Sequence, residues 1–572
     1  MKCAFPNEAV PPPELEVVMK DIINKCDGLP LALEVLGKYL KRKRDYEEWE
    51  QTLNVLKRAE KISNKEQQIF LDATIFFCNS AKHKRLNFGE RNEWTLSKAK
   101  AAWRAVYEVN EQQLWQNLVD RSLVYCVGED DTVKVHEQLQ GLGQKIASEP
   151  SNVGKCRVWD GEVGSKMLCT TTEDLDGKGY HALRVGNGRF FERINIPEAA
   201  LSNFKKVKFL DVDNRVTIAG PKDGELVPTE VVLLKCHGPD LFDPAVQTRL
   251  AVLELSWMWR DLPPSIGQLS GLKHLTIDNF FGRTLPASFG ELTALQHLTL
   301  TRAGKLESLP ESFGQLSNLN YLRFKSCNSL NTLPDSFAQL NALHRLSFLH
   351  CQGLESLPNS FGKLSALNHL EFICCKQLHT LPESFGELKT LHHLELSDCT
   401  ELQSLPNSFG ELNALNSLKL CPDSELHTLP ESFGDLSTLT ELDLKCKYLL
   451  NLPESFGQLT NLQRLEIYAD TERRADSLGD LKGLRDLNIG YYSATSIPNS
   501  IINLPLLHRF CLSFEGDLVE PLPPWLITPN VPSNILTGSK VVFQVQDGCF
   551  SLIESQSSFA LLTGYLAGRH GH

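Results

Sequence analysis

Several features that assign a chain to a common class of protein are missing from this 572-residue sequence. No run of about 18 apolar residues occurs, so no membrane-spanning helix is predicted. Met1 is followed by no apolar secretion signal, and no Asn-x-Ser/Thr acceptor sequence is present. The 16 cysteines follow no disulfide framework spacing. Together these absences favour a reducing cytoplasmic, or nuclear, environment over secretion.

The chain also lacks the charge and the motif of two functional classes. Its 70 acidic residues outnumber 58 basic ones, giving a formal net charge of −12 that opposes binding to a phosphate backbone. We therefore expect neither a nucleic-acid nor a membrane partner. No G-x-x-x-x-G-K-(S/T) sequence occurs, so the loop that cradles nucleotide phosphates is absent and ATP hydrolysis is not expected. The chain is predicted not to be an enzyme.

A 24-residue pattern, L-x-x-L-P-x-S-F-G-x-L-x-x-L-x-x-L-x-(L/F), repeats between Leu306 and Leu426. A period of this length with this leucine spacing is typical of a leucine-rich-repeat solenoid. The predicted fold is therefore α+β with several domains. A helical, winged-helix-like module precedes a right-handed α/β solenoid with parallel strands on its concave face. Such an array presents a long surface to another macromolecule.

One repeat can be interpreted residue by residue. Leu322 and Phe324 are two positions apart and share one face of a short strand. Leu309-Pro310 turns the chain, since proline suits the first position of a short helical turn. Phe313 then points inward, and Gly314 is expected to permit the tight return. The buried surface of each repeat exists only when neighbouring repeats stack on it.

Four cysteines also recur 24 residues apart, at Cys327, Cys351, Cys375 and Cys399. One interpretation is a ladder of disulfides or metal ligands. The other is a column of small buried thiols. We favour the thiols, because one sulfur per strand does not supply the Cys-x-x-Cys geometry of a zinc site. No metal site is predicted.

The x positions of the L-x-x-L-x-L strands are expected to face the concave side. The second x reads His274, His297, Tyr321, Arg345, His369, His393, Ser417, Glu441 and Arg464. Imidazole, phenol and guanidinium groups in one column suit a protein partner, because tyrosine and arginine are frequent interface anchors. A solvated sheet face, a metal site or a pH sensor are the alternatives. Towards Glu441, Asp443 and Glu466 the column turns acidic, which predicts an electrostatically bipolar partner.

The region before the repeats has a different pattern. Glu111–Val119 is predicted as a helix, Ser122–Val127 and Thr132–Val135 as strands, and His136–Ser148 as another helix. This order is typical of a winged-helix arrangement. The first of these helices contains no Lys or Arg, so we interpret the module as a protein-contact or regulatory unit rather than a DNA reader.

Motifs in this region resemble those of one known family. Cys26–Leu33 reads CDGLPLAL and resembles the GLPLAL motif of the NB-ARC module in plant intracellular immune receptors. Phe70–Ala73 resembles the start of its second ARC subdomain, Val135–Glu137 stands where the family carries Met-His-Asp, and Gly154–Asp160 resembles the run that joins the module to the repeats. The likeness covers most of residues 1–160 and favours the class with TIR-type domains or its bryophyte relatives.

The resemblance implies two contacts with ADP. The GLPL proline of the family lines the adenine pocket, which carries over to Pro30. The Met-His-Asp histidine contacts the β-phosphate, which carries over to His136, at the start of a predicted helix where anions are favoured. Glu137 replaces the usual aspartate. ADP is thus implied by resemblance, whereas the absent phosphate loop argues that no cofactor is required.

These observations give a map of the chain. The predicted segments are an ARC1-like helical subdomain over 1–60, an ARC2-like winged-helix subdomain over 61–150, a linker over 151–180, a leucine-rich-repeat solenoid over 181–528 that is regular from about 250, and a cap or irregular tail over 529–572. We expect a disease-resistance-type receptor without its front half, whose repeats bind a pathogen effector or a host protein and whose ARC remnant relays or restrains signalling. The alternatives are a leucine-rich-repeat scaffold of the Ras-group type and a nucleotide switch completed by further N-terminal sequence. The oligomeric state stays open.

Overall fold

The computed structural model describes the chain in segments that fall into two compact units. Unit 1 comprises Met1–Ser256 and Gly271–Leu275, and unit 2 comprises Trp257–Ser270 and Thr276–His572. The described residues are 15–25, 40, 46–59, 64–74, 95–108, 110–121, 123–127, 131–135, 139–140, 143, 156–158, 161–170, 180–186, 194–197, 199–202, 204–213, 216–219, 227–237, 243–245, 247–420, 425–446, 448–449, 451–468, 476–491, 499–514 and 540–543. Among them, no helix has the length and apolar character needed to cross a membrane.

Unit 1 begins with helices and one antiparallel hairpin. The elements are α1 (Glu16–Lys25), α3 (Tyr46–Ala59), α4 (Asn64–Asp72), α5 (Leu96–Tyr107), α6 (Glu111–Asp120), β1 (Val124–Val127) and β2 (Thr132–Val135). The helix and the two strands predicted over 111–135 are confirmed. Side chains start two of the helices, because Thr95 accepts from the backbone N–H of Lys98 and Asn110 from that of Gln113. Most of the helix predicted after the hairpin lies outside the described residues.

A parallel sheet follows in the same unit. It contains β3 (Cys156–Val158), β4 (Tyr180–Val185), β6 (Phe209–Val212), β8 (Leu233–His237) and β9 (Val252–Met258), paired in that order, beside α8 (Gly161–Thr170), α9 (Ala199–Ser202) and the parallel pair β5 (Ile194–Pro197) and β7 (Val216–Ala219). Both β3 and α8 lie within residues 151–180, the segment predicted as a linker. The short strand escapes prediction because Cys156-Arg157-Val158 shows no leucine pattern.

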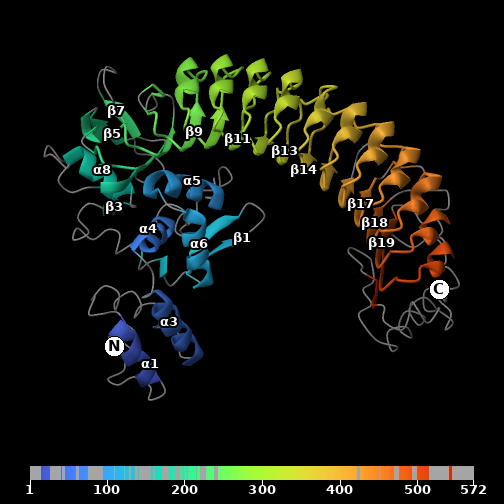
Figure 1. Ribbon diagram of the computed structural model, residues 1–572, viewed down its shortest axis with the longest axis horizontal. Coiled ribbons are helices and arrows are strands. Elements are labelled where there is room, and N and C mark those ends of the chain that lie inside the picture. Colours follow the sequence, from blue (N-terminus) through green and yellow to red (C-terminus); the bar gives the residue numbers. More distant parts are fainter. Residues whose placement is uncertain are drawn as a thin grey trace, which may run out of the picture. The chain divides into compact units, whose positions relative to one another are not determined.

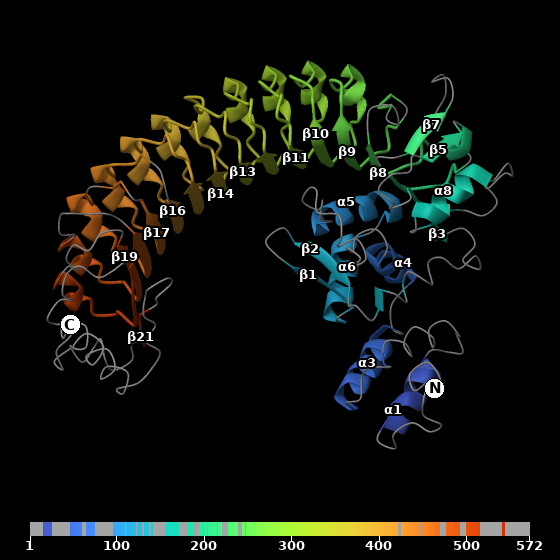
Figure 2. The same ribbon diagram turned by 180° about the vertical axis from the view of Figure 1, so that it is seen from behind.

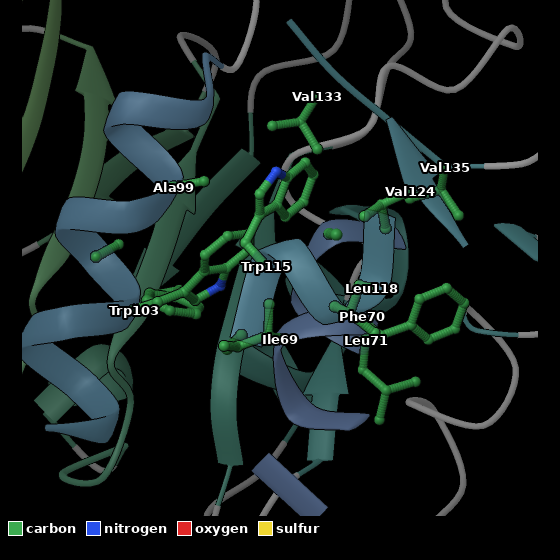
Figure 3. Close-up of a cluster of buried hydrophobic side chains, with 14 of the residues drawn as sticks. Ile69, Phe70, Leu71, Ala99, Trp103, Trp115, Leu118, Val124, Val133 and Val135 are labelled. Carbon is green, nitrogen blue, oxygen red and sulfur yellow. The ribbon is translucent and has the colours of Figure 1, made fainter. Parts of the chain in front are cut away.

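The helical elements of unit 1 pack on one face of this sheet. Ala182, Phe209, Leu233 and Val252 occupy matching positions on four successive strands, and each has 0% of its surface exposed. They belong to one hydrophobic cluster with residues of α4, α5, α6 and the hairpin. Within that cluster the indole rings of Trp103 and Trp115 are stacked, with centroids 5.8 Å apart (Figure 3). Burying aromatic and aliphatic surface of this extent fixes the helices on the sheet.

A buried polar network lies at the same boundary. The Arg157 guanidinium on β3 donates to Asp72 at 2.7 Å and to Gln68 at 3.0 Å, and both charged side chains are at most 1% exposed. Tyr107 donates its only hydroxyl hydrogen to Asp72 at 2.7 Å. His181 Nε2 lies 3.1 Å from the same hydroxyl oxygen, so this nitrogen must carry a hydrogen and donate. Burial and the Asp72 carboxylate raise the pKa of Tyr107, which keeps the phenol neutral.

Unit 2 contains the regular repeats, each a short strand followed by a 3₁₀ helix. The strands are β10 (His274–Phe280), whose first two residues belong to unit 1, β11 (His297–Thr301), β12 (Tyr321–Lys325), β13 (Arg345–Leu349), β14 (His369–Ile373), β15 (His393–Ser397), β16 (Ser417–Leu420), β17 (Glu441–Lys445), β18 (Arg464–Tyr468), β19 (Asp486–Tyr491), β20 (Arg509–Phe514) and β21 (Lys540–Phe543). The 3₁₀ helices are η6 (Pro264–Gln268), η7 (Ala287–Glu291), η8 (Glu311–Gln315), η9 (Asp335–Gln339), η10 (Phe361–Lys363), η11 (Glu383–Glu387), η12 (Asn407–Glu411), η13 (Glu431–Asp435), η14 (Glu454–Gln458), η15 (Asp476–Asp480) and η16 (Asn499–Asn503).

The repeats of unit 2 follow one another in a curved row, with the strands along its inner side and the 3₁₀ helices along its outer side (Figures 1 and 2). Leu322 and Phe324 point inward with 0% exposure, as predicted. Phe313 and its equivalents stack from repeat to repeat with ring centroids about 6 Å apart. Pro310 directly precedes η8 instead of opening it, a shift of one residue from the prediction.

The glycine after each of these phenylalanines has a packing role. A Cβ at Gly314 would collide with the carbonyl oxygen of Ser336 in the next repeat, so close approach explains this glycine better than a tight turn. One repeat carries Ala338 at this position, and there the next helix, η10, spans 3 residues where its neighbours span 5. The Phe337–Phe361 step is also wide, at 6.4 Å between centroids. The alanine methyl group thus coincides with a wider spacing between the stacked phenylalanine rings of adjacent repeats.

This comparison within the chain predicts the effect of a methyl group elsewhere. Gly386→Ala should lower the free energy of unfolding by about 1–3 kcal/mol, because the new Cβ meets the Ser408 carbonyl oxygen. Ala338→Gly serves as the control. It should change the free energy of unfolding by less than about 1 kcal/mol, because the spacing to the next repeat already accommodates alanine at this position. Urea unfolding followed by circular dichroism measures both. Equal effects of the two substitutions would contradict the packing explanation.

The buried network gives a second prediction. Arg157→Leu should destabilise unit 1 by about 3–5 kcal/mol, because it leaves the Asp72 carboxylate buried without its cation. The double variant Arg157→Leu with Asp72→Leu should recover most of this loss. Thermal unfolding monitored by tryptophan fluorescence reports on the transition, since two indoles lie in the adjoining cluster.

The control for this experiment is Lys166→Leu, which removes an exposed cation from a surface pair with Glu162. It should leave the transition nearly unchanged. A double variant as unstable as the Arg157 single variant would show that the network contributes nothing through charge pairing.

Candidate functional site

The candidate site is the face of β11–β19 that points away from the leucine and phenylalanine interior. The strands pair in parallel without register shifts, so equivalent residues form columns. The first column is His297, Tyr321, Arg345, His369, His393, Ser417, Glu441, Arg464 and Asp486. The second column is Thr299, Arg323, Ser347, Glu371, Glu395, Lys419, Asp443, Glu466 and Asn488.

Seven of the eight predicted contact residues lie together in the first column. His297, Tyr321, Arg345, His369 and His393 are half-buried, whereas Glu441 and Arg464 are exposed. Their placement on one face is therefore as predicted, and their binding to a partner stays a prediction.

The eighth residue, His274, requires a correction. It is only 2% exposed and belongs to unit 1, where its backbone N–H donates to Ala251. This hydrogen bond places His274 beside Val252 of β9, a residue that packs against the helices of unit 1. Burial, with Arg104 of α5 as a second cause, also lowers the pKa of the neighbouring Lys273. The repeat pattern alone could not show which strands the helices cover.

An ion-pair network occupies the centre of the site. The Glu371 carboxylate accepts from Arg345 at 3.0 Å, from the Ser347 hydroxyl at 2.7 Å, and lies 2.5 Å from His369 Nε2. Burial raises the pKa of Glu371, but the hydrogen bonds from His369 and Ser347 and the nearby charges outweigh it and lower the pKa to about 2. These contacts hold four side chains from two adjacent strands, β13 and β14, in fixed positions.

A second carboxylate network, with different partners, lies one strand further along. His369 and His393 stack with ring centroids 4.4 Å apart. The Glu395 carboxylate accepts from the Ser397 hydroxyl at 2.8 Å and pairs with Lys419 at 3.4 Å. The His393 imidazole, whose Nε2 lies 3.9 Å from the Glu395 carboxylate, is the main cause that lowers the pKa of Glu395 to about 2, against the opposing effect of burial. Both carboxylates therefore stay charged at any physiological pH.

The two ends of the site differ in charge. At the C-terminal end Lys445 lies 3.1 Å from Asp443 and 3.0 Å from Glu466. Although burial lowers the pKa of Lys445, hydrogen bonds to these two carboxylates outweigh it and raise the pKa above its usual value. At the N-terminal end the Arg323 guanidinium lies over the Tyr321 ring, 5.4 Å from its centroid.

Of the second column, the sequence analysis named only Asp443 and Glu466, because it otherwise followed one x position per strand. Arg323, Glu371 and Glu395 lie two residues after members of the first column and share their face. The same strand periodicity would therefore have found them. Their contacts across neighbouring strands depend on rotamers, which the pattern does not specify.

The cysteine column lies inside the solenoid, away from this site. Cys327, Cys351, Cys375 and Cys399 are at most 1% exposed, and the Cys351 thiol, for example, donates to the Phe324 carbonyl at 3.6 Å. Burial raises the pKa of Cys399 to about 12. The interpretation as small buried thiols is confirmed. In the described part of the chain, no group of three or more His, Cys, Asp or Glu side chains is placed to hold a metal ion.

Pro30 and His136, the residues expected to contact ADP by resemblance, lie outside the described residues. The chain also supplies no phosphate-binding loop sequence. Contact of these two residues with ADP therefore stays a prediction from the resemblance.

Comparisons with known proteins match the repeats. Residues 373–533 match a family described as a leucine-rich repeat region, and residues 247–327 match the R13L1/DRL21 leucine-rich repeats. The chain is 26% identical over 298 residues to a probable disease resistance protein, At4g27220, of Arabidopsis thaliana, covering 46% of this chain and 28% of that protein. It is 24% identical over 228 residues to the TMV resistance protein N of Nicotiana glutinosa, covering 37% and 18% respectively.

The chain thus spans less than a third of the length of these relatives. Among solved structures, the leucine-rich repeat domain of the type III effector XCV3220 (XopL) is 27% identical, with 41% of this chain and 75% of that chain covered at a TM-score of 0.32. The plant peptide hormone receptor RGFR1 in complex with RGF2 is 20% identical, with 59% and 64% covered at a TM-score of 0.29.

The lowered pKa of Glu371 predicts how the stability of the site depends on pH. A carboxylate whose pKa falls on folding stabilises the folded state above its usual pKa of 4.5, and this contribution disappears as the pH falls towards 2. Glu371→Gln should therefore cost about 1.5–3 kcal/mol at pH 6.5, by loss of charged hydrogen bonds, and progressively less below pH 4.5. Urea unfolding across this pH range measures the difference.

Glu411→Gln is the matched control, because that carboxylate is 63% exposed and pairs with Lys389 at the surface. It should have little effect at any pH. If Glu371→Gln lowers the free energy of unfolding by the same amount from pH 6.5 to pH 2.5, the charged network is contradicted.

Proposed function

We propose that this chain, a leucine-rich-repeat protein similar to plant disease-resistance proteins, recognises a protein partner on the outward face of β11–β19. The partner class is a pathogen effector or a host protein that such an effector modifies. The observation that carries the proposal is a contrast between the strand faces of the two units. In unit 1 the face that carries Phe209, Leu233 and Val252 is apolar and covered by helices, whereas in unit 2 the outward face is polar and accessible from His297 onwards.

The polar part of the face has the composition of a binding surface. Tyr321 and Arg345 are of the residue types that most often supply the binding energy of an interface. They lie at matching positions on adjacent strands, with histidine on either side. The other face of the sheet is buried, because Leu322, Phe324 and their equivalents pack in the interior. The outward side chains are therefore held on a rigid backbone.

The hydrogen-bonded network also favours recognition over a merely solvated surface. Arg345, His369 and Glu371 already hold one another, so less side-chain entropy is lost when a partner binds. Fixed charges in addition penalise partners with the wrong charge pattern. Specific recognition of one protein is what a resistance-type role requires.

The helical elements of unit 1 are proposed to relay or restrain the signal. The buried pair of Asp72 with Arg157 and the tryptophan cluster join these elements to the first strands of the sheet. Such a joint supports transmission of strain between repeats and helices. The proposal includes no nucleotide step and no catalysis by this chain, because the residues for a phosphate cradle are lacking.

The proposal predicts that partner capture depends on the first column. The chain is expressed with an affinity tag in plant tissue exposed to a pathogen, and co-purified proteins are quantified by mass spectrometry. A specific partner should be retained by the unaltered chain and depleted at least tenfold by Tyr321→Ala combined with Arg345→Ala, since two anchor residues cost roughly 2 kcal/mol or more.

The control is Glu311→Ala combined with Gln339→Ala, which alters the side of the 3₁₀ helices instead. A partner confirmed with purified components must bind this control normally. If every captured protein is lost equally from both variants, or from neither, the outward face is not the recognition surface.

A further inference from the structure

The outward face of unit 2 is divided into two halves of opposite charge. On β11–β13 the outward positions carry three cations and no carboxylate: His297, Thr299, Thr301, Tyr321, Arg323, Lys325, Arg345, Ser347 and Leu349. On β14–β19 six carboxylates face three cations: Glu371, Glu395, Glu441, Asp443, Glu466 and Asp486 against Lys419, Lys445 and Arg464. Charges sorted in this way along one face favour a partner sorted in the opposite order.

We infer that the partner presents an extended segment with acidic residues over β11–β13 and basic residues over β17–β19. This inference rests on the proposed function and specifies the chemistry of its ligand. The segment runs across the strands, along the row of repeats, so that it meets both halves at once.

The N-terminal half suits a carboxylate-bearing segment that also carries an aromatic or aliphatic group. Arg323 lies over the Tyr321 ring, and that ring lies 5.5 Å from the ring of His297, so cationic and aromatic surfaces are adjacent. Burial lowers the pKa of Lys325, and an approaching carboxylate would reverse that effect by favouring the ammonium form. Leu349, half-buried on the next strand, adds apolar surface.

The C-terminal half suits basic side chains. Arg464 and Glu441 pair at 3.2 Å, yet their side chains remain 59% and 50% exposed, so solvent and a partner reach them. Lys445 is already engaged by Asp443 and Glu466. Because carboxylates outnumber cations here, arriving lysine or arginine side chains are attracted rather than repelled.

The strand spacing sets the distance between the two blocks of charge in the partner. β12 and β17 are five strand steps apart, which is about 24 Å at roughly 4.8 Å per step. An extended peptide rises about 3.3 Å per residue, so about seven residues separate the acidic block from the basic block. A polyanion such as single-stranded nucleic acid would match the first half and be repelled by the second.

The test uses the purified full chain and two fluorescein-labelled peptides of identical composition. The block peptide has four glutamates, a seven-residue Gly/Ser spacer containing one tyrosine, and four lysines, whereas the control peptide alternates the charges. Fluorescence anisotropy at about 50 mM salt should show the block peptide binding at least tenfold more tightly. Affinity should fall steeply by about 0.5 M salt, where exposed charges are screened.

Two charge-reversal variants locate the binding. Arg323→Glu combined with Lys325→Glu should weaken block-peptide binding at least tenfold. Lys363→Glu combined with Lys389→Glu makes the same change of charge on exposed lysines outside the strands, and should weaken it less than twofold. Circular dichroism melting curves confirm that both variants stay folded.

The outcomes separate this inference from the proposed function. Three results would overturn the charge-sorted ligand. They are equal affinity for the two peptides, unchanged affinity of the block peptide for the variant at Arg323 and Lys325, or tighter binding of a 12-nucleotide single-stranded DNA. If capture of the natural partner still requires Tyr321 and Arg345, the proposed function survives such a result. If neither peptide binds and capture ignores these two residues, both fail.

Discussion

The structure of unit 2 depends on one constraint, the unshifted register of its parallel strands. Because Tyr321, Arg345 and His369 pair position by position, each sequence position becomes a column that runs along the row. Leucine and phenylalanine in the inward columns stack into a continuous interior. The outward columns then bring side chains from different repeats within hydrogen-bonding distance. One backbone rule thus creates both the core and the surface that we propose for recognition.

The outward strand positions have a different environment in each of the two units. Where the outward column carries Phe209 and Leu233, burying the apolar surface against helices lowers the free energy, and the face closes. Where it carries Tyr321 and Arg345, desolvation without matched partners would be costly, and the face stays accessible. The position of the helical elements is therefore encoded in the outward residues of the strands, which carry no signal in the leucine pattern itself.

How much of this followed from sequence differs between regions for physical reasons. The repeats and the first column could be predicted, because a period of 24 residues repeats each signal many times. The pairing of Arg157 with Asp72 could not, since it joins residues 85 positions apart and each looks like an ordinary polar residue beside apolar neighbours. The prediction that His274 lies on an accessible face was wrong for a related reason. A local pattern gives the direction of a side chain but not what packs on it.

The charge network has a consequence for how binding energy is distributed. In a row of repeats each repeat contacts only its neighbours. A contact with a single repeat would therefore stabilise one or two strands and leave the other repeats unaffected. The ion pairs of Glu371 with Arg345 and of Glu395 with Lys419, joined by the stacked imidazoles, connect four successive strands on the surface. A partner that touches several of these strands therefore binds a surface that is already connected. This connection favours a long, charge-patterned partner over a compact ligand held by a single repeat.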